Sequence, residues 1–319
     1  MIVLGIDIGG TSIKGAVIND KGKILDRFSL SVNKADSPEF TIGKLCNDIN
    51  DIISNNKYQE PISGIGIGTP GIIDHEKGVI LSSPNLPTWS MFNLKEFISK
   101  KTKLPVEINN DANAAALGES TFGSGKNYNN VIMLTLGTGV GSGIIIDKKV
   151  YDGNQHQGAE IGHMVIKGNG RLCGCGRRGC LEAYASASAL IKISNEEMKK
   201  HPESKMNQIV KELNKCDARV PFIAARDNDK VAKRIIRNYV SDLSEGIINI
   251  CNIFRPEAII LSGGVANEGD YLLDMVKEYV KKRHYGMLNS PVVDIRLATL
   301  GYDSGKIGAA CLVLQKENS

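Results

Sequence analysis

The chain has 319 residues, enough for two domains, and its 42% hydrophobic and 23% charged residues are ordinary for a globular protein. Its formal net charge of +4 is small, which favours neither nucleic acid nor an anionic membrane as a partner. The opening run Met1–Leu4 lacks a basic region and a cleavage site, and no apolar run is long enough to cross a membrane. Three of the seven cysteines crowd into one segment while the others are scattered, so we expect a cytoplasmic protein with reduced thiols.

The first part of the chain consists of short apolar runs separated by turns. These runs predict strands at residues 2–8, 13–18, 23–30, 62–67 and 106–109. A helix is predicted after Ser37-Pro38, because serine caps helices and proline is favoured in their first turn. An alanine-rich helix is expected at 112–119. Strands alternating with helices indicate an α/β fold.

The chain then repeats its opening pattern. Residues 131–136 and 142–146 are predicted strands joined by a glycine turn, as the first two strands are. This repeat predicts two related α/β domains. Residues 186–239 should be mostly helical, and a strand at 258–261 should end at Gly263-Gly264.

Two glycine turns are candidates for phosphate binding. Asp7-Ile8-Gly9-Gly10-Thr11 and Thr135-Leu136-Gly137-Thr138-Gly139 each join two strands, and backbone N–H groups in such turns can point at phosphate oxygens. Neither matches the Walker A pattern. One such turn is usually only a hairpin, but two in corresponding places favour phosphate binding. Asp7 either holds a metal ion through water or caps its turn.

The most specific motif is a histidine followed by three cysteines. His163, Cys173, Cys175 and Cys180 make a four-ligand set that suits tetrahedral Zn²⁺, and the intervening glycines let the loop wrap an ion. Because no position stays open for water, this zinc should be structural. The alternatives are free thiols in a flexible loop or a disulfide, which a reducing cytosol disfavours.

Acidic and amide side chains lie near these motifs. Asn110-Asp111 follows a strand end, where ligands bind in α/β sheets. Glu160 and Glu182 flank the zinc motif, which would fix both. Such groups can hold sugar hydroxyls, and one carboxylate can take a hydroxyl proton during phosphoryl transfer. Each has a simpler alternative role: Asp111 as a helix N-cap, the two glutamates as surface charges.

Together these motifs resemble the ROK family of bacterial sugar kinases, and within it the glucokinases. The resemblance covers nearly the whole chain and rests on residues 7–11, 107–113, 136–141, 160–163, 173–182 and 261–265. It implies a duplicated actin-like ATPase (ribonuclease H-like) fold with two domains around a cleft. We place one domain at residues 1–118, with the C-terminal helix 304–319 packing back on it. The other is 119–303, which carries the zinc loop.

The resemblance also implies roles for single residues. Asp111 would be the general base. The sugar would be held by Asn85, Asn110, Asp111, Glu160, His163 and Glu182. ATP and Mg²⁺ would be held by Asp7, Gly9, Gly10, Thr11, Lys14, Gly137 and Thr138, with Gly264 at the adenosine. One ring nitrogen of His163 would bind zinc while the other faces the sugar.

The implied reaction transfers the ATP γ-phosphoryl group to the 6-hydroxyl of glucose. N-acetylmannosamine or another hexose is the alternative substrate, since residues 182–186 resemble the amino-sugar kinases as well. A sugar-responsive transcriptional repressor is disfavoured because the first strand begins at Ile2, which leaves no room for a DNA-binding segment. A structural filament would not need the zinc loop. The resemblance implies a homodimer or homotetramer, with no nucleic-acid or membrane partner.

Overall fold

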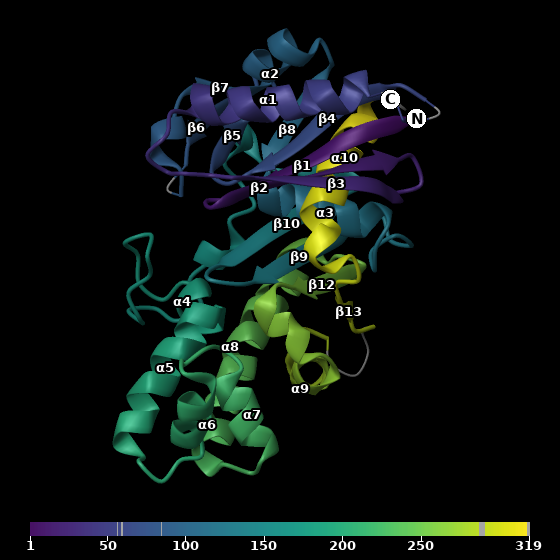
Figure 1. Cartoon of the computed structure of the whole chain (residues 1–319). Helices are drawn as coiled ribbons and strands as arrows, with labels where there is room; N and C mark the ends of the chain where they lie inside the picture. Colours follow the sequence, from purple (N-terminus) through teal and green to yellow (C-terminus); the bar gives the residue numbers. More distant parts are fainter. Residues whose placement is uncertain (56, 59, 84, 287–290, 318–319) are drawn as a thin grey trace. The chain divides into compact units, whose positions relative to one another are not determined.

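The computed structural model describes residues 1–55, 57–58, 60–83, 85–286 and 291–317 (Figure 1). The chain divides into two compact units. The first comprises Met1–Asn130, Gly143–Ala159 and Thr299–Ser319, and the second comprises Val131–Ser142 and Glu160–Ala298. The domain limits drawn from the sequence, 1–118 with 304–319 and 119–303, stay a prediction. Among the described residues, no helix combines the length and apolarity needed to cross a bilayer.

The sheet of the first unit has the strand order β3-β2-β1-β4-β8. Its strands are β1 (Ile2–Ile8), β2 (Ser12–Asn19), β3 (Ile24–Ser31), β4 (Ile62–Thr69) and β8 (Val106–Asn110), which confirms all five predicted strands. β1, β4 and β8 run parallel, so their carboxyl ends meet at one edge of the sheet. The register sets Asp7 beside Gly68 and Gly68 beside Asn109, which places these residues in one row near that edge.

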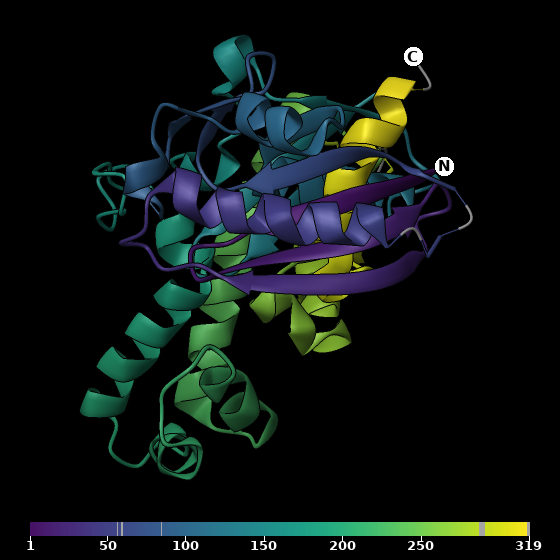
Figure 2. The ribbon, with the colours of Figure 1, turned by 45° about the horizontal axis from the view of Figure 1, so that its top comes forward.

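Alternation along β1 explains how the two faces of this sheet are covered. Leu4, Ile6 and Ile8 are fully buried and share a core with α1 (Pro38–Ser54) and α2 (Leu94–Thr102). Gly5 lies on the opposite face, where a Cβ atom would come within 2.0 Å of the carbonyl oxygen of Lys306. There α10 (Ser304–Glu317) packs beside α3 (Asp111–Thr121). Figure 2 shows α1 in front of the sheet and α10, in yellow, behind it.

The predicted helix after Ser37 is confirmed, and so is its cap. Oγ of Ser37 accepts a hydrogen bond from the backbone N–H of Phe40 at 3.3 Å, and Pro38 is the first helical residue. The C-terminal helix begins at Ser304 itself. Its predicted last residues, 318 and 319, lie outside the described part of the chain.

The first unit also contains a small antiparallel sheet that was not predicted. Its strands are β5 (Ile72–Asp74), β6 (Val79–Ser82) and β7 (Phe92–Asn93), in that order. Runs of two to four residues are too short to show a period-2 pattern. The 3-10 turn η2 (Asn154–His156) lies against β5.

A second five-stranded sheet has the order β11-β10-β9-β12-β13. Its strands are β9 (Val131–Leu136), β10 (Val140–Ile146), β11 (Lys149–Tyr151), β12 (Ala258–Ser262) and β13 (Asp294–Leu297). β12 runs parallel to both β9 and β13. The order repeats that of the first sheet strand for strand, so the duplication predicted from the two glycine turns is confirmed.

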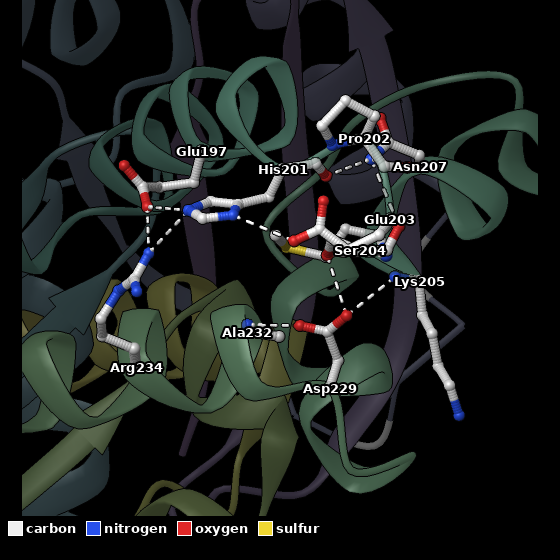
Figure 3. Close-up of polar contacts among 11 residues, drawn as sticks. Glu197, His201, Pro202, Glu203, Ser204, Lys205, Asn207, Asp229, Ala232 and Arg234 are labelled. Carbon is white, nitrogen blue, oxygen red and sulfur yellow. Dashed lines mark hydrogen bonds and ion pairs between the residues drawn. The ribbon is translucent and has the colours of Figure 1, made fainter.

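The second unit contains most of the helices, as the sequence predicted for residues 186–239. They are α4 (Glu182–Ala185), α5 (Ala187–Lys200), α6 (Met206–Leu213), α7 (Val220–Arg226), α8 (Lys230–Phe254) and α9 (Asp270–Arg283). Asp229 caps α8 by accepting a hydrogen bond from the N–H of Ala232 at 2.7 Å (Figure 3). The other carboxylate oxygen of Asp229 accepts hydrogen bonds from the hydroxyl of Ser204 and the backbone N–H of Lys205. These bonds connect the α5–α6 loop to the start of α8.

Candidate functional site

The end of β1 in the first unit places a half-buried carboxylate beside a glycine turn. Asp7 lies on the face covered by α10, and burial raises its pKa, while the charges of Lys306 and Lys14 offset only part of that effect. The N–H of Gly9 donates to the carbonyl of Ser12 at 2.9 Å, which closes the turn before β2. A carboxylate that is costly to keep ionised here would be stabilised by a cation.

The turn also has an open outer side. Thr11 and Lys14 are exposed, and Lys14 pairs with Asp7 across the β1–β2 register. A Cβ at Gly10 would lie 3.9 Å from that of Asn85, so exposed Asn85 lies beside this turn. The predicted nucleotide and sugar residues of the first unit are therefore neighbours here.

The end of β8 fixes the position of Asp111 through three asparagines. The side-chain oxygen of Asn110 accepts from the N–H groups of Ala112 and Asn113 at 2.9 and 3.4 Å, and its amide donates to the carbonyl of Gly71 at 3.0 Å. Oδ1 of Asn109 accepts from the N–H of Asn110 at 2.7 Å and from the Asn113 amide at 3.0 Å. Asn110, rather than Asp111, is therefore the N-cap of α3.

Asp111 is consequently the first helical residue and not the cap that we had considered. Its Oδ1 accepts a hydrogen bond from the N–H of Ala112 at 2.9 Å, and the residue is half-buried. The carboxylate lies at the N-terminus of α3, the positive end of the helix dipole. A carboxylate held in this way is a candidate general base.

The predicted zinc ligands converge in the second unit. Nδ1 of His163 lies 3.6 Å from Sγ of Cys173, and the sulfurs of Cys175 and Cys180 are 3.7 Å apart. All four ligand atoms lie within 4.8 Å of one another. A tetrahedral zinc bonded at about 2.3 Å to sulfur and about 2.0 Å to nitrogen would separate two sulfurs by about 3.8 Å and sulfur from nitrogen by about 3.5 Å. The residues therefore fit zinc and do not form a disulfide.

Glu182 connects this cysteine cluster to the second glycine turn. Its Oε1 lies 3.5 Å from Sγ of Cys173, and its Oε2 accepts from the N–H of Val140 at 3.0 Å. A Cβ at Gly139 would come within 2.2 Å of Oε2, so a larger residue there would displace the carboxylate from its present position. The sequence placed Glu182 beside the cysteines but gave no sign of its bond to Val140. That contact joins residues that are distant in the sequence.

His163 is the last residue of the 3-10 turn η3 (Ile161–His163), and Glu160 lies just before this turn. The N–H of His163 donates to the carbonyl of Glu160 at 3.0 Å, and the hydroxyl of Ser142 accepts from the N–H of Ile161 at 3.1 Å. The Glu160 side chain is exposed, whereas that of His163 is half-buried. Ser142 is thus a positioning residue for this turn that the sequence analysis did not identify.

The parallel pair β9 and β12 brings two further predicted segments together. Ser262 pairs with Thr135, and a Cβ at Gly263 would lie 2.7 Å from the backbone of Leu136. The turn at Gly137-Thr138 therefore lies next to Gly264, which opens the 3-10 turn η4 (Gly264–Glu268). Gly264 is exposed, and among the described residues none beyond its chain neighbours comes within 4 Å of its Cβ position. Ligands of α/β sheets bind at such carboxyl ends.

Each unit therefore brings one part of the predicted set together. The first unit holds Asp7, Gly9, Gly10, Thr11, Lys14, Asn85, Asn110 and Asp111. The second holds Gly137, Thr138, Glu160, His163, Cys173, Cys175, Cys180, Glu182 and Gly264. The roles of these residues in binding and catalysis stay predictions.

The duplicated sheets, the paired glycine turns and the histidine–cysteine cluster define the class of actin-like α/β sugar kinases that the sequence predicted. Residues 3–316 match the model of the ROK family, and the chain belongs to this family.

Three relatives show how far the similarity extends. A glucokinase of Halalkalibacterium halodurans is 37% identical over 99% of this chain and 96% of its own length. A ROK family glucokinase from Streptomyces griseus, solved in complex with glucose and AMPPNP, is 32% identical. It matches 98% of this chain and 99% of its own with a TM-score of 0.80. The xylose repressor of Bacillus subtilis is 33% identical, and the match covers 98% of this chain but 76% of the repressor.

Proposed function

We propose that this chain is an ATP-dependent glucokinase that transfers the γ-phosphoryl group of ATP to the 6-hydroxyl of glucose. The observation that carries the proposal is full-length similarity to a glucokinase, with 99% of this chain matched at 37% identity. The structure of a similar glucokinase with glucose and AMPPNP supports glucose and ATP as the small-molecule partners. The catalytic and binding roles below rest on the geometry of each unit.

Asp111 is the proposed general base, which accepts the proton of the attacking hydroxyl. Because the asparagine contacts fix the first turn of α3, the carboxylate has a defined position at the end of β8. A positioned base of this kind contributes about 10²–10⁴-fold to the rate. The remaining sugar hydroxyls would be held by Asn85, Asn110, Glu160, His163 and Glu182.

The glycine turns are the proposed phosphate sites. Their backbone N–H groups would contact ATP oxygens at Gly9, Gly10, Thr11, Gly137 and Thr138, and Lys14 would add a positive charge. Asp7 would hold Mg²⁺ through water, because the ion would offset the cost of a buried carboxylate. Gly264 would contact the adenosine, as its exposed position beside Gly137 allows.

Zinc is the proposed occupant of the cysteine cluster. Nδ1 of His163 would be its nitrogen ligand, which leaves Nε2 of the same ring for a sugar hydroxyl. The metal supplies a rigid tie across the loop. Glu182 contacts both Cys173 and the N–H of Val140, so this tie would also position the second glycine turn.

Location and assembly complete the proposal. We expect a cytoplasmic protein that forms a homodimer or homotetramer and binds neither nucleic acid nor membrane. The xylose repressor relative makes sugar-dependent DNA binding the second candidate function. ATP consumption that depends on a hexose, without DNA binding, would decide for the kinase.

The substrate is tested by comparing kcat/KM for glucose and for N-acetylmannosamine at the same concentrations of ATP and Mg²⁺. We expect glucose to be preferred, because a site built for the compact 2-hydroxyl of glucose rejects a bulky axial acetamido group. A preference of tenfold or more for N-acetylmannosamine, about 1.4 kcal/mol of transition-state binding, would make that sugar the substrate instead.

A further inference from the structure

A second cluster of metal-ligating side chains lies in the first unit, apart from the cysteine loop. His75 follows β5, while Asp152 and His156 come from the segment after β11 that contains η2. None of the three belongs to the motifs assigned above. We propose that His75, Asp152 and His156 form a binding site for a divalent transition-metal ion. This site goes beyond the proposed kinase function and does not depend on it.

The three side chains converge on one point. Nδ1 of His75 lies 2.9 Å from Oδ2 of Asp152, and Nδ1 of His156 lies 3.1 Å from the same oxygen. The ligand atoms all lie within 4.8 Å of one another. The imidazole ring centres are 3.8 Å apart with the planes tilted by 50°, so the rings do not stack face to face. The side chains are 34%, 13% and 18% exposed for His75, Asp152 and His156, which leaves one open side.

Both imidazoles approach the same carboxylate oxygen, as ion pairs of similar length. Nδ1 of His156 is well aligned toward Asp152, but Nδ1 of His75 is buried without an aligned hydrogen bond despite its short distance to the same oxygen. Its partner is nevertheless Asp152, with which it forms an ion pair at 2.9 Å. A metal ion bound to both Nδ1 atoms and to Oδ2 would take the place of these two ion pairs.

The spacing of the ligand atoms indicates the class of ion. With ligands about 2.1 Å from the metal, a right angle gives a nitrogen–oxygen distance of about 3.0 Å and a tetrahedral angle about 3.4 Å. The observed 2.9 and 3.1 Å fit right angles. Two imidazoles and one carboxylate are a ligand set that suits ions such as Fe²⁺, Co²⁺ or Ni²⁺, with water completing the coordination. Mg²⁺ and Ca²⁺ prefer all-oxygen sites.

The ion would fasten a loop with an unusual backbone. Gln155, His156 and Ala159 have φ values of 55°, 58° and 64°, in the left-handed region that such residues seldom adopt. Metal ligation through Asp152 and His156 would hold this loop against the hairpin after β5. Residue 159 leads directly to Glu160 in the sequence. The site would therefore order the segment immediately ahead of that glutamate.

The test is a titration of the full-length protein with Co²⁺ or Ni²⁺. Metal binding is monitored by calorimetry and by absorption spectroscopy. Sulfur-to-cobalt charge-transfer bands report any ion in the cysteine cluster, so binding there is counted separately. We expect about one further ion per chain without sulfur bands, and His75→Ala or Asp152→Asn should weaken that binding tenfold or more. The control is His201→Ala: this histidine lies between Glu197 and Glu203 in the second unit (Figure 3) and should leave the titration unchanged.

The wild-type titration alone can overturn the proposal, whether or not the variants fold. Absence of any ion beyond the cysteine cluster would do so. So would a further ion that His75→Ala, with a wild-type circular dichroism spectrum, binds as tightly as the wild type. If His201→Ala lost the further ion, that ion would bind near His201, and the proposed site at His75, Asp152 and His156 would be wrong. Because the readout is metal binding, these results do not depend on whether the chain phosphorylates glucose.

Discussion

At the scale of single residues, the proposed chemistry depends on polar groups whose positions are fixed by other polar groups. Asn109, Asn110 and Asn113 set the first turn of α3 and thereby Asp111. Glu182 is held by Val140 and lies against the cysteine cluster. The sequence pointed to Asp111 and Glu182 as candidates because they lie beside recognisable motifs. It missed Ser142, and it missed His75 and Asp152, because contacts between distant residues leave no local pattern.

Asp7 provides a prediction with a pH dependence. Burial raises its pKa, so the folded chain binds the proton more tightly than the unfolded chain does. The resulting stabilisation is complete below the unfolded pKa of about 3.9 and is lost as the pH rises through the higher folded pKa. Asp7→Asn should therefore raise the melting temperature at pH 7 but not at pH 3.5, while turnover with Mg²⁺ and ATP falls.

Thermal melting at the two pH values and a coupled kinase assay measure both effects. Asp51→Asn, an exposed position on α1, is the matched control and should change neither. An equal or lower melting temperature for Asp7→Asn at pH 7 would mean that ionised Asp7 does not destabilise the fold. Unchanged turnover would remove the proposed link to Mg²⁺.

At the scale of elements, strands and helices with a strong local sequence pattern were predicted correctly, and those with a weak pattern were missed. The five strands of the first sheet and helix α1 followed from apolar periodicity and from the Ser37-Pro38 start. The β5–β7 sheet was missed because strands of two to four residues carry almost no pattern. Ser304, where the predicted C-terminal helix begins, is already helical and is not its cap. Caps depend on backbone geometry, which the sequence specifies only loosely.

The packing of α10 on α3 gives a prediction at this scale. A Cβ at Gly308 would lie 1.6 Å from the carbonyl oxygen of Ala114, and a backbone atom cannot turn aside. Gly308→Ala should therefore destabilise the protein by about 3 kcal/mol or prevent folding. Gly43→Ala is the control, because its Cβ meets nothing within 4 Å on α1. It should stabilise by about 0.5–1 kcal/mol through helix propensity.

Denaturation curves of both variants decide the point. If Gly308→Ala unfolds like the wild type, α10 and α3 do not pack in backbone contact as described. Both changes replace glycine by alanine in a helix, so propensity alone predicts a gain for both. Only the close approach of the two backbones separates them.

The cysteine cluster gives a prediction for the second unit. The protein should carry about one zinc per chain in this cluster, and Cys175→Ser should lower both the zinc content and the melting temperature. Activity should fall as well, because Glu182 contacts Cys173. Cys216→Ser, a half-buried cysteine outside the cluster, should retain zinc. Metal analysis showing equal zinc in both variants would contradict the assignment.

At the scale of the whole molecule, the repeated glycine turns were sufficient to predict a duplicated fold. The two sheets share one strand order, and the chain belongs to the ROK family over residues 3–316. The sequence predicted this because each half begins with the same strand, glycine turn and strand. The preferred sugar did not follow from the repeat, because the motifs proposed to hold hydroxyls resemble those of several sugar kinases.

The value of kcat for glucose phosphorylation by Asp111→Asn tests the proposed reaction most directly. Asparagine keeps the shape of the side chain and can still accept the N–H of Ala112, but it cannot take the hydroxyl proton. We predict that kcat falls by about 10²–10⁴-fold, while the KM for glucose and the melting temperature stay near the wild-type values. The control Asp51→Asn should change none of the three quantities. A kcat near the wild-type value would show that Asp111 is not the general base of this kinase.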